Sequence, residues 1–356
     1  MVSPRMAENE ALEFGRIYAQ AERDVISRIA NKLSRDKTAS ISQWELTKLN
    51  ELRKLRSGIE MHIGAKLDNF TDKELRRAIE QAYKAGMESA VTDLARVLPD
   101  DEIPVKAGFA QIHQDAVRAQ HQALAEKLKA SHFRIVRQAN DVYRTAVRRG
   151  VEHVLTGAGT RLEGAQLVLN EFANRGVTGF IDSAGRSWDL ASYAEMSIRT
   201  NVGQAAVQGH INRLQDNGRD LVYVSGHEES CPICDPWEGE ILSISGEDER
   251  YPSVADAEAD GLFHPNCAHN LTAYIEGLTE TDEPEPGEED YEERQEQRYN
   301  ERQIRKWKRR EAAAMTEKAQ AKSKQKVREW QGRQAEFTEK TGRRRKYGRE
   351  QITQAR

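Results

Sequence analysis

The chain has 356 residues, of which 38% are hydrophobic and 31% are charged. This length exceeds one ordinary domain, and the small hydrophobic fraction favours long solvated helices over one compact core. The net charge of -4 argues against a nucleic-acid partner for the chain as a whole. No basic N-terminal stretch precedes an apolar run, and no run approaches about 18 apolar residues. We therefore expect a soluble protein made in a cytoplasm, with no membrane partner.

The charges are segregated along the chain. Residues 301–356 contain 19 Lys/Arg and 7 Asp/Glu, a net charge of +12. Residues 281–300 contain 2 Arg and 9 Asp/Glu, a net charge of -7. Because almost nothing there can be buried, we expect residues 278–300 to form a disordered acidic linker and residues 301–356 a basic tail that is disordered or transiently helical.

The first 157 residues carry the apolar spacing of amphipathic helices. Three- and four-residue spacing predicts helices over 14–33, 49–63 and 71–98, the third with Thr71 as its N-cap. Residues 109–149 predict a long helix whose thin apolar stripe suits packing against one partner. These features indicate an elongated helical N-terminal region over residues 1–157.

Residues 158–277 predict a small mixed module. A short helix over 162–172 ends at Gly176, and residues 177–181 and 186–188 flank a turn typical of a β-hairpin. Asp189 is expected to cap a helix that ends at Gly218, and strands are expected at 221–224, 241–244 and 271–275. The fold class is therefore mainly α, with a small α+β C-terminal module.

All three cysteines of the chain lie in this module. Cys231 and Cys234 form a C-x2-C pair, and His264 and Cys267 form an H-x2-C pair with the same internal spacing. Four such ligands complete a tetrahedral Zn2+ shell, so we expect a structural zinc ion that holds the module together. His269, two residues after Cys267, is an alternative to His264 as the fourth ligand.

Two other interpretations of these residues stay open. Free cysteine is among the most buried residue types, so the three thiols can simply pack in an apolar core. Alternatively, the histidines and Asn266 belong to a metal-dependent nuclease, or His264 is a base for a nucleophilic Cys267. No second acidic residue pairs with Glu238 or Glu240, as general acid–base catalysis would require, so we expect no enzyme and assign no catalytic residue.

Residues 174–277 resemble the phage minor capsid proteins and, more broadly, the Mu F-like head morphogenesis proteins of tailed phages. The resemblance is specific over about a hundred residues, looser over the N-terminal helices and absent from the tail. The motifs that carry it are Gly179-Phe180-Ile181-Asp182, Gly185-Arg186-Ser187-Trp188, Tyr193-Ala194-Glu195-Met196, Arg199-Thr200, Cys231-Pro232-Ile233-Cys234, Pro236-Trp237-Glu238-Gly239 and His264-Pro265-Asn266-Cys267.

The resemblance implies a low-copy component of a phage head, at the interior or the portal vertex, that is made in the host cytoplasm. It implies portal and major capsid proteins as partners, with residues 1–157 docking to them, and roles in head morphogenesis and in DNA packaging or delivery. In related proteins the motif commonly continues as His-Pro-x-Cys-Arg-Cys, which makes His269 a natural substitute for the last cysteine. The alternatives are a nuclease or hydrolase delivered with the genome, and a transient assembly factor that leaves the particle.

The basic tail is a candidate contact for phage DNA. Clusters that combine cations with an aromatic residue can attract phosphate and stack on bases, although a solvated tail carries the same composition. The candidate residues are Lys306, Trp307, Arg309, Arg310, Arg343, Arg344, Arg345 and Lys346.

Overall fold

The computed structural model describes residues 4–35, 40–99, 111–176, 178–181, 185, 187–226, 230–281 and 288–353. The chain forms two compact units that do not follow the order of the sequence. Unit 1 consists of residues 1–11, 72–126 and 195–295, and unit 2 of residues 12–71, 127–194 and 296–356. Among the described helices, none is both long and apolar enough to cross a bilayer.

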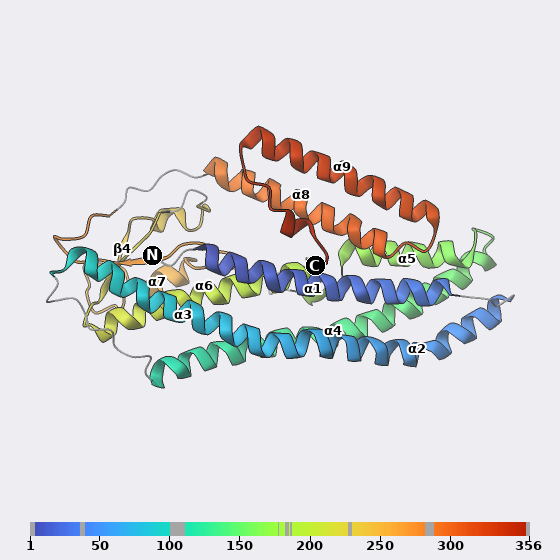
Figure 1. The fold of residues 1–356 in the computed structure, drawn as a ribbon, viewed down its shortest axis with the longest axis horizontal. Helices are drawn as coiled ribbons and strands as arrows, with labels where there is room; N and C mark the ends of the chain where they lie inside the picture. Colours follow the sequence, from blue (N-terminus) through green and yellow to red (C-terminus); the bar gives the residue numbers. More distant parts are fainter. Residues whose placement is uncertain are drawn as a thin grey trace. The chain divides into compact units, whose positions relative to one another are not determined.

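The N-terminal region is helical, as the apolar spacing predicts. Helix α1 covers Pro4–Ser34, α2 covers Ile41–Ile63, α3 covers Asn69–Val97 and α4 covers Gln111–Leu155 (Figure 1). The expected break before Thr71 is absent, because the π-helical turn η1, Gly64–Asp68, joins α2 directly to α3. The 45 residues of α4 span about 67 Å at 1.5 Å per residue.

The thin apolar stripe of α4 is buried within the chain. In unit 2, Ile135, Ala139 and Tyr143 have no exposed surface. The same unit buries Lys48 of α2, whose Nζ donates hydrogen bonds to the carbonyl oxygens of Lys32 and Arg35 at 2.7 and 2.6 Å. The Lys32 carbonyl lies in the last turn of α1, and the Arg35 carbonyl directly follows the helix. A cation at the C-terminal end of a helix is electrostatically favourable.

Helices α3 and α6 approach closely within unit 1. Helix α6 covers Leu190–Asp216, and a Cβ added to its Gly209 would lie 2.1 Å from the carbonyl oxygen of Tyr83. A Cβ added to Gly86 of α3 would lie 1.9 Å from the carbonyl oxygen of Ala206. Glycine at both positions therefore allows backbone-to-backbone contact between the two helices.

The predicted hairpin and its flanking helices are confirmed. Helix α5, Arg161–Arg175, ends at Gly176 with a positive φ of 75°. Strands β1, Thr178–Ile181, and β2, Ser187–Asp189, pair antiparallel. Asp189 caps α6, because its carboxylate accepts hydrogen bonds from the backbone N–H and hydroxyl of Ser192.

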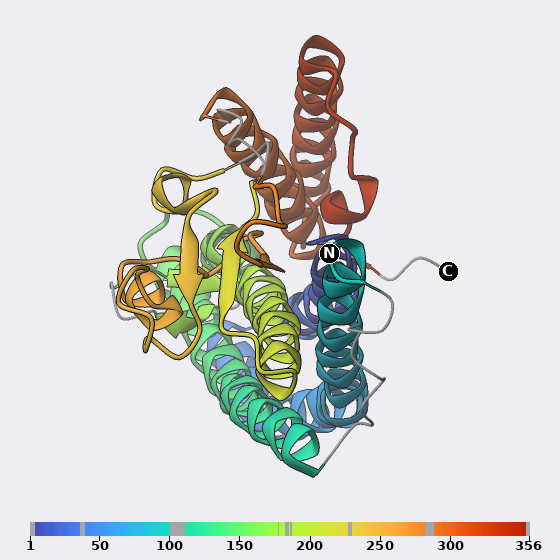
Figure 2. The same cartoon turned by 90° about the vertical axis from the view of Figure 1, so that its left-hand side faces the viewer.

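Unit 1 contains the small sheet that positions the cysteines. Strands β3, Leu221–Val224, β4, Ile241–Ser243, and β5, Leu271–Ala273, form an antiparallel sheet in the order β4-β3-β5 (Figure 2). All three lie within the segments expected to be strands. The short helix α7, Val254–Ala259, follows β4, and its Val254 and Ala257 join the sheet's core together with Cys231 and Cys234.

The C-terminal segment differs from the sequence-based expectation. The structure has two helices there, α8 over Glu288–Ala312 and α9 over Glu317–Thr341, followed by the short 3-10 helix η3, Tyr347–Glu350. Helices α8 and α9 run side by side (Figure 1). The described residues after 287 are therefore helical and partly buried. Helix begins at residue 288, within the segment expected to be a disordered linker, and residues 301–356 are largely helical, where a disordered or transiently helical tail was expected. Residues 282–287 lie outside the described part of the chain.

Three arginines explain why this segment packs despite its charge. Arg305, Arg309 and Arg349 are each less than a tenth exposed. Within unit 2, the Arg309 guanidinium donates to a carboxylate oxygen of Glu22 at 3.3 Å and to the carbonyl oxygen of Ala173 at 3.1 Å. Composition alone could not show these partners, because Glu22 is 287 residues away.

Candidate metal centre

The first pair of sulfur ligands sits on a tight turn in unit 1. After β3, the backbone N–H groups of Cys234 and Asp235 both donate to the carbonyl oxygen of Cys231 at 3.0 Å. The 3-10 helix η2, Asp235–Trp237, then continues the turn. This local geometry brings Cys231 and Cys234 together, and both side chains are buried.

The second pair lies in the loop between α7 and β5. The backbone N–H of Cys267 donates to the carbonyl oxygen of His264 at 2.9 Å, so His264 and Cys267 also share one turn. Phe263 and Asn266 have positive φ angles of 59° and 74°, an uncommon conformation for residues other than glycine.

Helix α6 fixes the strained loop. Arg199 donates to the side-chain oxygen of Asn266 at 2.5 Å, and the backbone N–H of Asn266 donates to the hydroxyl of Thr200 at 3.2 Å. Arg199 also pairs with Glu195 at 3.2 Å, an i,i+4 salt bridge within α6. The guanidinium therefore ties the loop that carries His264, Cys267 and His269 to a rigid element.

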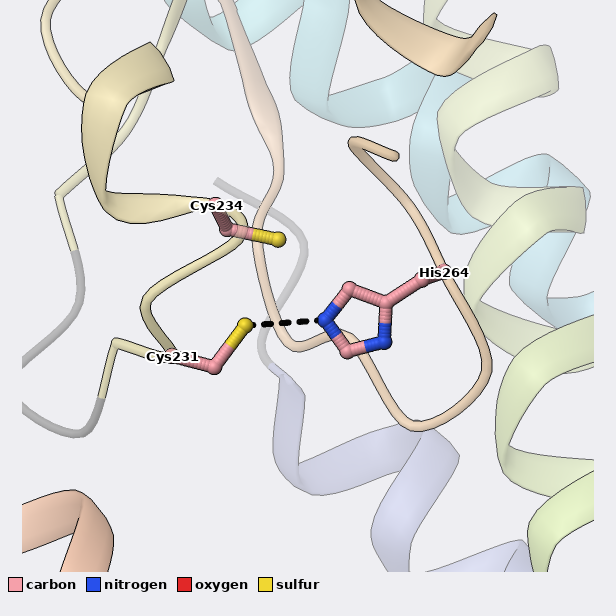
Figure 3. Close-up of side chains that lie close together, drawn as sticks. All are labelled: Cys231, Cys234 and His264. Carbon is pink, nitrogen blue, oxygen red and sulfur yellow. Dashed lines mark hydrogen bonds between the residues drawn. The ribbon is translucent and has the colours of Figure 1, made fainter. Parts of the chain in front are cut away.

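All five candidate ligands come together, in two overlapping groups of three. Cys231, Cys234 and His264 form one group, and Cys234, Cys267 and His269 form the other; within each group all donor atoms lie within 4.8 Å of one another. Figure 3 shows the His264 ring pointing at the Cys231 sulfur, with 2.9 Å between Nε2 and Sγ. Cys234 belongs to both groups.

The donor spacing fits a zinc shell in the group of Cys234, Cys267 and His269, whereas the 2.9 Å between the Cys231 sulfur and Nε2 of His264 is shorter than the sulfur–nitrogen spacing of such a shell. Zn–S bonds of about 2.3 Å and Zn–N bonds of about 2.0–2.1 Å place two sulfurs of a tetrahedral site about 3.8 Å apart, and a sulfur and a nitrogen about 3.5 Å apart. The sulfurs of Cys234 and Cys267 are 3.6 Å apart, and Nδ1 of His269 is 3.3 Å from the sulfur of Cys267. This cluster could hold a metal ion.

The two histidines are held differently. Nε2–H of His269 donates to the carboxylate of Glu238 at 2.6 Å, and the side chains of both residues are almost completely buried. His264 is half-buried, and its Nδ1 lies 2.9 Å from the carbonyl oxygen of the adjacent Pro265. A carboxylate or a backbone carbonyl behind the imidazole is the usual second contact of a histidine that ligates zinc, because it fixes the tautomer and the ring orientation. Glu238 provides a buried carboxylate for His269, and Pro265 provides a carbonyl for the half-buried His264.

The electrostatics of the cluster favour a thiolate. The hydrogen bond from the Cys234 thiol lowers the pKa of Cys267 and raises that of Cys234. Burial alone would lower the pKa of His269, but its hydrogen bonds to Cys267 and Glu238 outweigh burial, and the pKa is raised. One thiol is therefore readily deprotonated beside an imidazole, and thiolate is the form that binds metal.

The sequence did not indicate the supporting residues Glu238 and Asn266. By sequence alone Glu238 has no assigned role, because no second acid pairs with it, and no local motif links it to a histidine 31 residues away. The positive φ of Asn266 has a weak local signal, since asparagine tolerates the left-handed region better than most residues.

The cations proposed to contact DNA through the tail are not equivalent. Arg309 is buried against Glu22, and Arg345 forms a two-bonded ion pair with Glu350 at 2.6 and 2.9 Å. Arg310 donates to Asn174 and lies over the ring of Trp307. Arg344 is exposed, whereas Lys306, Arg343 and Lys346 are half-buried.

The comparisons with known proteins identify the class of the chain. The phage minor capsid protein 2 family matches residues 2–339, which include both units and most of the basic segment. The chain belongs to this family, which gives it a structural role in a phage head. Searches of the curated proteins and of the solved structures found no significant match.

Proposed function

We propose that the chain is a portal-associated minor component of the phage head that acts in head morphogenesis and in DNA packaging or delivery. Its partners in this proposal are the portal and major capsid proteins, and residues 1–157 provide the docking region. The same proposal places it in the virion head, at the interior or the portal vertex, without catalytic activity.

Apolar residues exposed on α2 carry this proposal. Leu46 and Leu49 are 63% and 41% exposed, lie three residues apart and therefore share one helix face. Met61, further along α2, is 73% exposed. Since the stripe of α4 is buried within the chain, this α2 face offers apolar surface that a partner can cover.

Co-sedimentation of the full chain with purified portal assemblies tests the docking. We expect Leu46→Gln/Leu49→Gln to abolish co-sedimentation, and Leu167→Gln, a control on α5 at 50% exposure, to leave it unchanged. A wild-type chain that stays monomeric and does not sediment with portal contradicts the proposal. Mass spectrometry of mature particles distinguishes a resident component from a transient assembly factor.

We also propose that a structural zinc ion binds Cys231, Cys234, Cys267 and one histidine, and that this histidine is His269. The supporting observation is the buried Glu238 carboxylate behind its ring. In this assignment His264 packs beside the site. Four protein ligands leave no position for water or substrate, so the site stabilises the module and is not catalytic.

Metal affinity of the purified full chain, measured by competition with a chelating dye, tests the assignment. We expect Glu238→Gln to weaken zinc binding by about 10- to 100-fold, and the adjacent exposed Glu240→Gln to have no effect. His269→Ala should lose zinc, and His264→Ala should retain it.

The opposite result for the two histidines would reverse the assignment to His264. A native protein that contains no metal contradicts the zinc site altogether and favours buried, unliganded thiols. Metal-dependent cleavage of DNA by the pure chain would support the rival enzyme, a genome-delivered nuclease.

The buried arginines reduce the number of tail residues that we propose to contact DNA. We keep it as a proposal for the exposed Arg344 and its half-buried neighbours Arg343 and Lys346. Arg309 and Arg345 already have carboxylate partners, which DNA would have to displace.

A further inference from the structure

One face of α4 carries a dense, one-signed charge. Between residues 127 and 149 this helix has seven cations and a single acid, Asp141, and all eight side chains are exposed. We call the seven cations the α4 cationic face: Lys127, Lys129, Arg134, Arg137, Arg144, Arg148 and Arg149. Their net charge with Asp141 is +6, in a chain whose overall charge is -4.

A groove in unit 2 runs along this face. It has a volume of about 680 Å³ and lies between α4 and the part of α2 that leads into the π-helical turn. Arg137 and Arg144 line it from α4, and Arg56 lines it from α2, where it is paired with Glu60. The acids Glu60, Asp68 and Asp141 also line the groove, and Phe133 is 79% exposed at its wall.

The floor of the groove is fixed. His132 is buried there, and its ring is hydrogen-bonded to the hydroxyl of Tyr18 at 2.9 Å and to the carboxylate of Asp68 at 2.6 Å. The exposed side chains above it therefore stand on a rigid helix rather than on a loop.

Arg137 and Arg144 have no partner within the described part of the fold. Neither makes a hydrogen bond or an ion pair among the residues that the structure describes, whereas Arg148 and Arg149 both reach Glu152. Arg137 and Arg144 lie seven residues apart, about 10.5 Å along the axis, and so project from the same side of α4. Two such guanidinium groups on one groove are suited to bind an anionic partner.

We propose that the α4 cationic face and its groove bind the phosphate backbone of DNA without sequence preference, with Phe133 stacking on bases of unpaired strands. The face spans about 33 Å, and duplex DNA presents one negative charge per about 1.7 Å over that length. Guanidinium groups match phosphate oxygens in bidentate geometry, and an exposed aromatic ring can stack on any base.

An acidic protein surface fits this face less well. Interfaces between proteins set their register with complementary charges, and between residues 127 and 149 of α4 Asp141 is the sole acid among eight charges. The other acids of the groove, Glu60 and Asp68, lie on α2 and the π-helical turn. A row of cations can bind a repeating polyanion in many positions. It does not fix the position of a folded protein partner, which needs charges of both signs. The proposal does not depend on the metal site or on the tail.

Fluorescence anisotropy of the full chain with a labelled 30-base-pair duplex, measured from 50 to 200 mM NaCl, tests the proposal. Each phosphate contact contributes about 0.9 to the slope of log affinity against log salt, so Arg137→Gln/Arg144→Gln should reduce the magnitude of the slope by about 1.8. Arg328→Gln/Arg333→Gln, which removes two exposed arginines from α9, is the matched control and should change neither slope nor affinity.

Phe133→Ala tests the aromatic contact. We expect binding to a single-stranded oligonucleotide to weaken roughly 5- to 100-fold, with little change for the duplex. All five positions are exposed, so circular dichroism should show unchanged folding for every variant.

Three results would overturn the proposal. The first is a wild-type chain that binds neither DNA form at 50 mM NaCl. The second is an equal loss of affinity in the α4 and α9 variants, which would reflect total charge alone. The third is tighter binding to poly-glutamate of equal charge than to duplex DNA, which would indicate an acidic protein as the partner.

Discussion

Replacement of Arg309 by methionine tests whether the basic C-terminal segment is part of the folded protein. The Arg309 side chain is 4% exposed and its partner Glu22 is fully buried. Arg309→Met removes the buried positive charge that faces the Glu22 carboxylate, so we expect it to destabilise unit 2 by about 3–5 kcal/mol. The exposed Arg328→Met on α9 should change stability by less than about 0.5 kcal/mol.

A double variant, Glu22→Met/Arg309→Met, distinguishes the effect of the lost counter-charge from the effect of lost packing. Glu22→Met/Arg309→Met removes both the guanidinium and its carboxylate partner at position 22. Two contacts of Arg309 are still lost: the hydrogen bond to the carbonyl oxygen of Ala173, worth about 1 kcal/mol, and the ion pair with Asp189 at 4.0 Å. We therefore expect the double variant to be more stable than Arg309→Met alone.

Amide hydrogen exchange, resolved by peptide, measures this effect on α8 and α9 directly. A loss of about 3 kcal/mol raises exchange from opened states by more than about 100-fold, because each 1.4 kcal/mol is a factor of ten. Unprotected α8 amides in the wild-type chain, or a cost below about 1 kcal/mol for Arg309→Met, would refute the buried ion pair and restore the disordered tail.

Two further predictions concern helix packing and pH. Gly86→Ala should cost about 1–3 kcal/mol or more in thermal unfolding, because its Cβ would overlap the carbonyl of Ala206, while Gly203→Ala on α6, with no atom within 4 Å, should be neutral or stabilising. Burial raises the pKa of Asp189, but Arg309 and other partners outweigh it and the pKa lies below the usual 3.8. Such a group stabilises the fold above about pH 4 and loses its contribution as pH falls through the lowered pKa, so Asp189→Asn should flatten the acid limb of a tryptophan-fluorescence titration; an unchanged acid limb would contradict this.

The elements of the fold were predictable where their signals are local. Strand β3 matches the predicted 221–224, because its β-branched and aromatic residues contrast with their surroundings. Gly176 marks the end of α5 for the same kind of reason, since a left-handed C-terminal residue is most often glycine. The break expected before Thr71 is wrong, because the π-helical turn carries the helix through a polar stretch without a cap.

The candidate ligands of the metal site could be predicted from the sequence, but the residues that hold those ligands in place could not. Two pairs with two-residue spacing and the use of every cysteine indicated the five residues that the structure brings together. The role of Glu238 depends on a tertiary contact between two buried groups on different elements. Sequence spacing alone therefore left His264 and His269 equivalent, whereas the buried carboxylate distinguishes them.

The cations of α4 and α8 show why a charge count alone does not tell exposed cations from buried ones. In α4 the exposed cations lie opposite an apolar stripe that includes Ile135 and Tyr143, so a helical projection can recognise the solvated face. In α8 the buried face is itself polar: Ile304 is its only branched aliphatic residue, beside Arg305 and Arg309. Hydrophobic patterning cannot detect such a face, because what makes its burial favourable is a carboxylate or a carbonyl from a distant part of the chain. Within the described fold, Arg137 and Arg144 have exposed guanidinium groups without a partner, whereas the guanidinium of Arg309 is buried against Glu22.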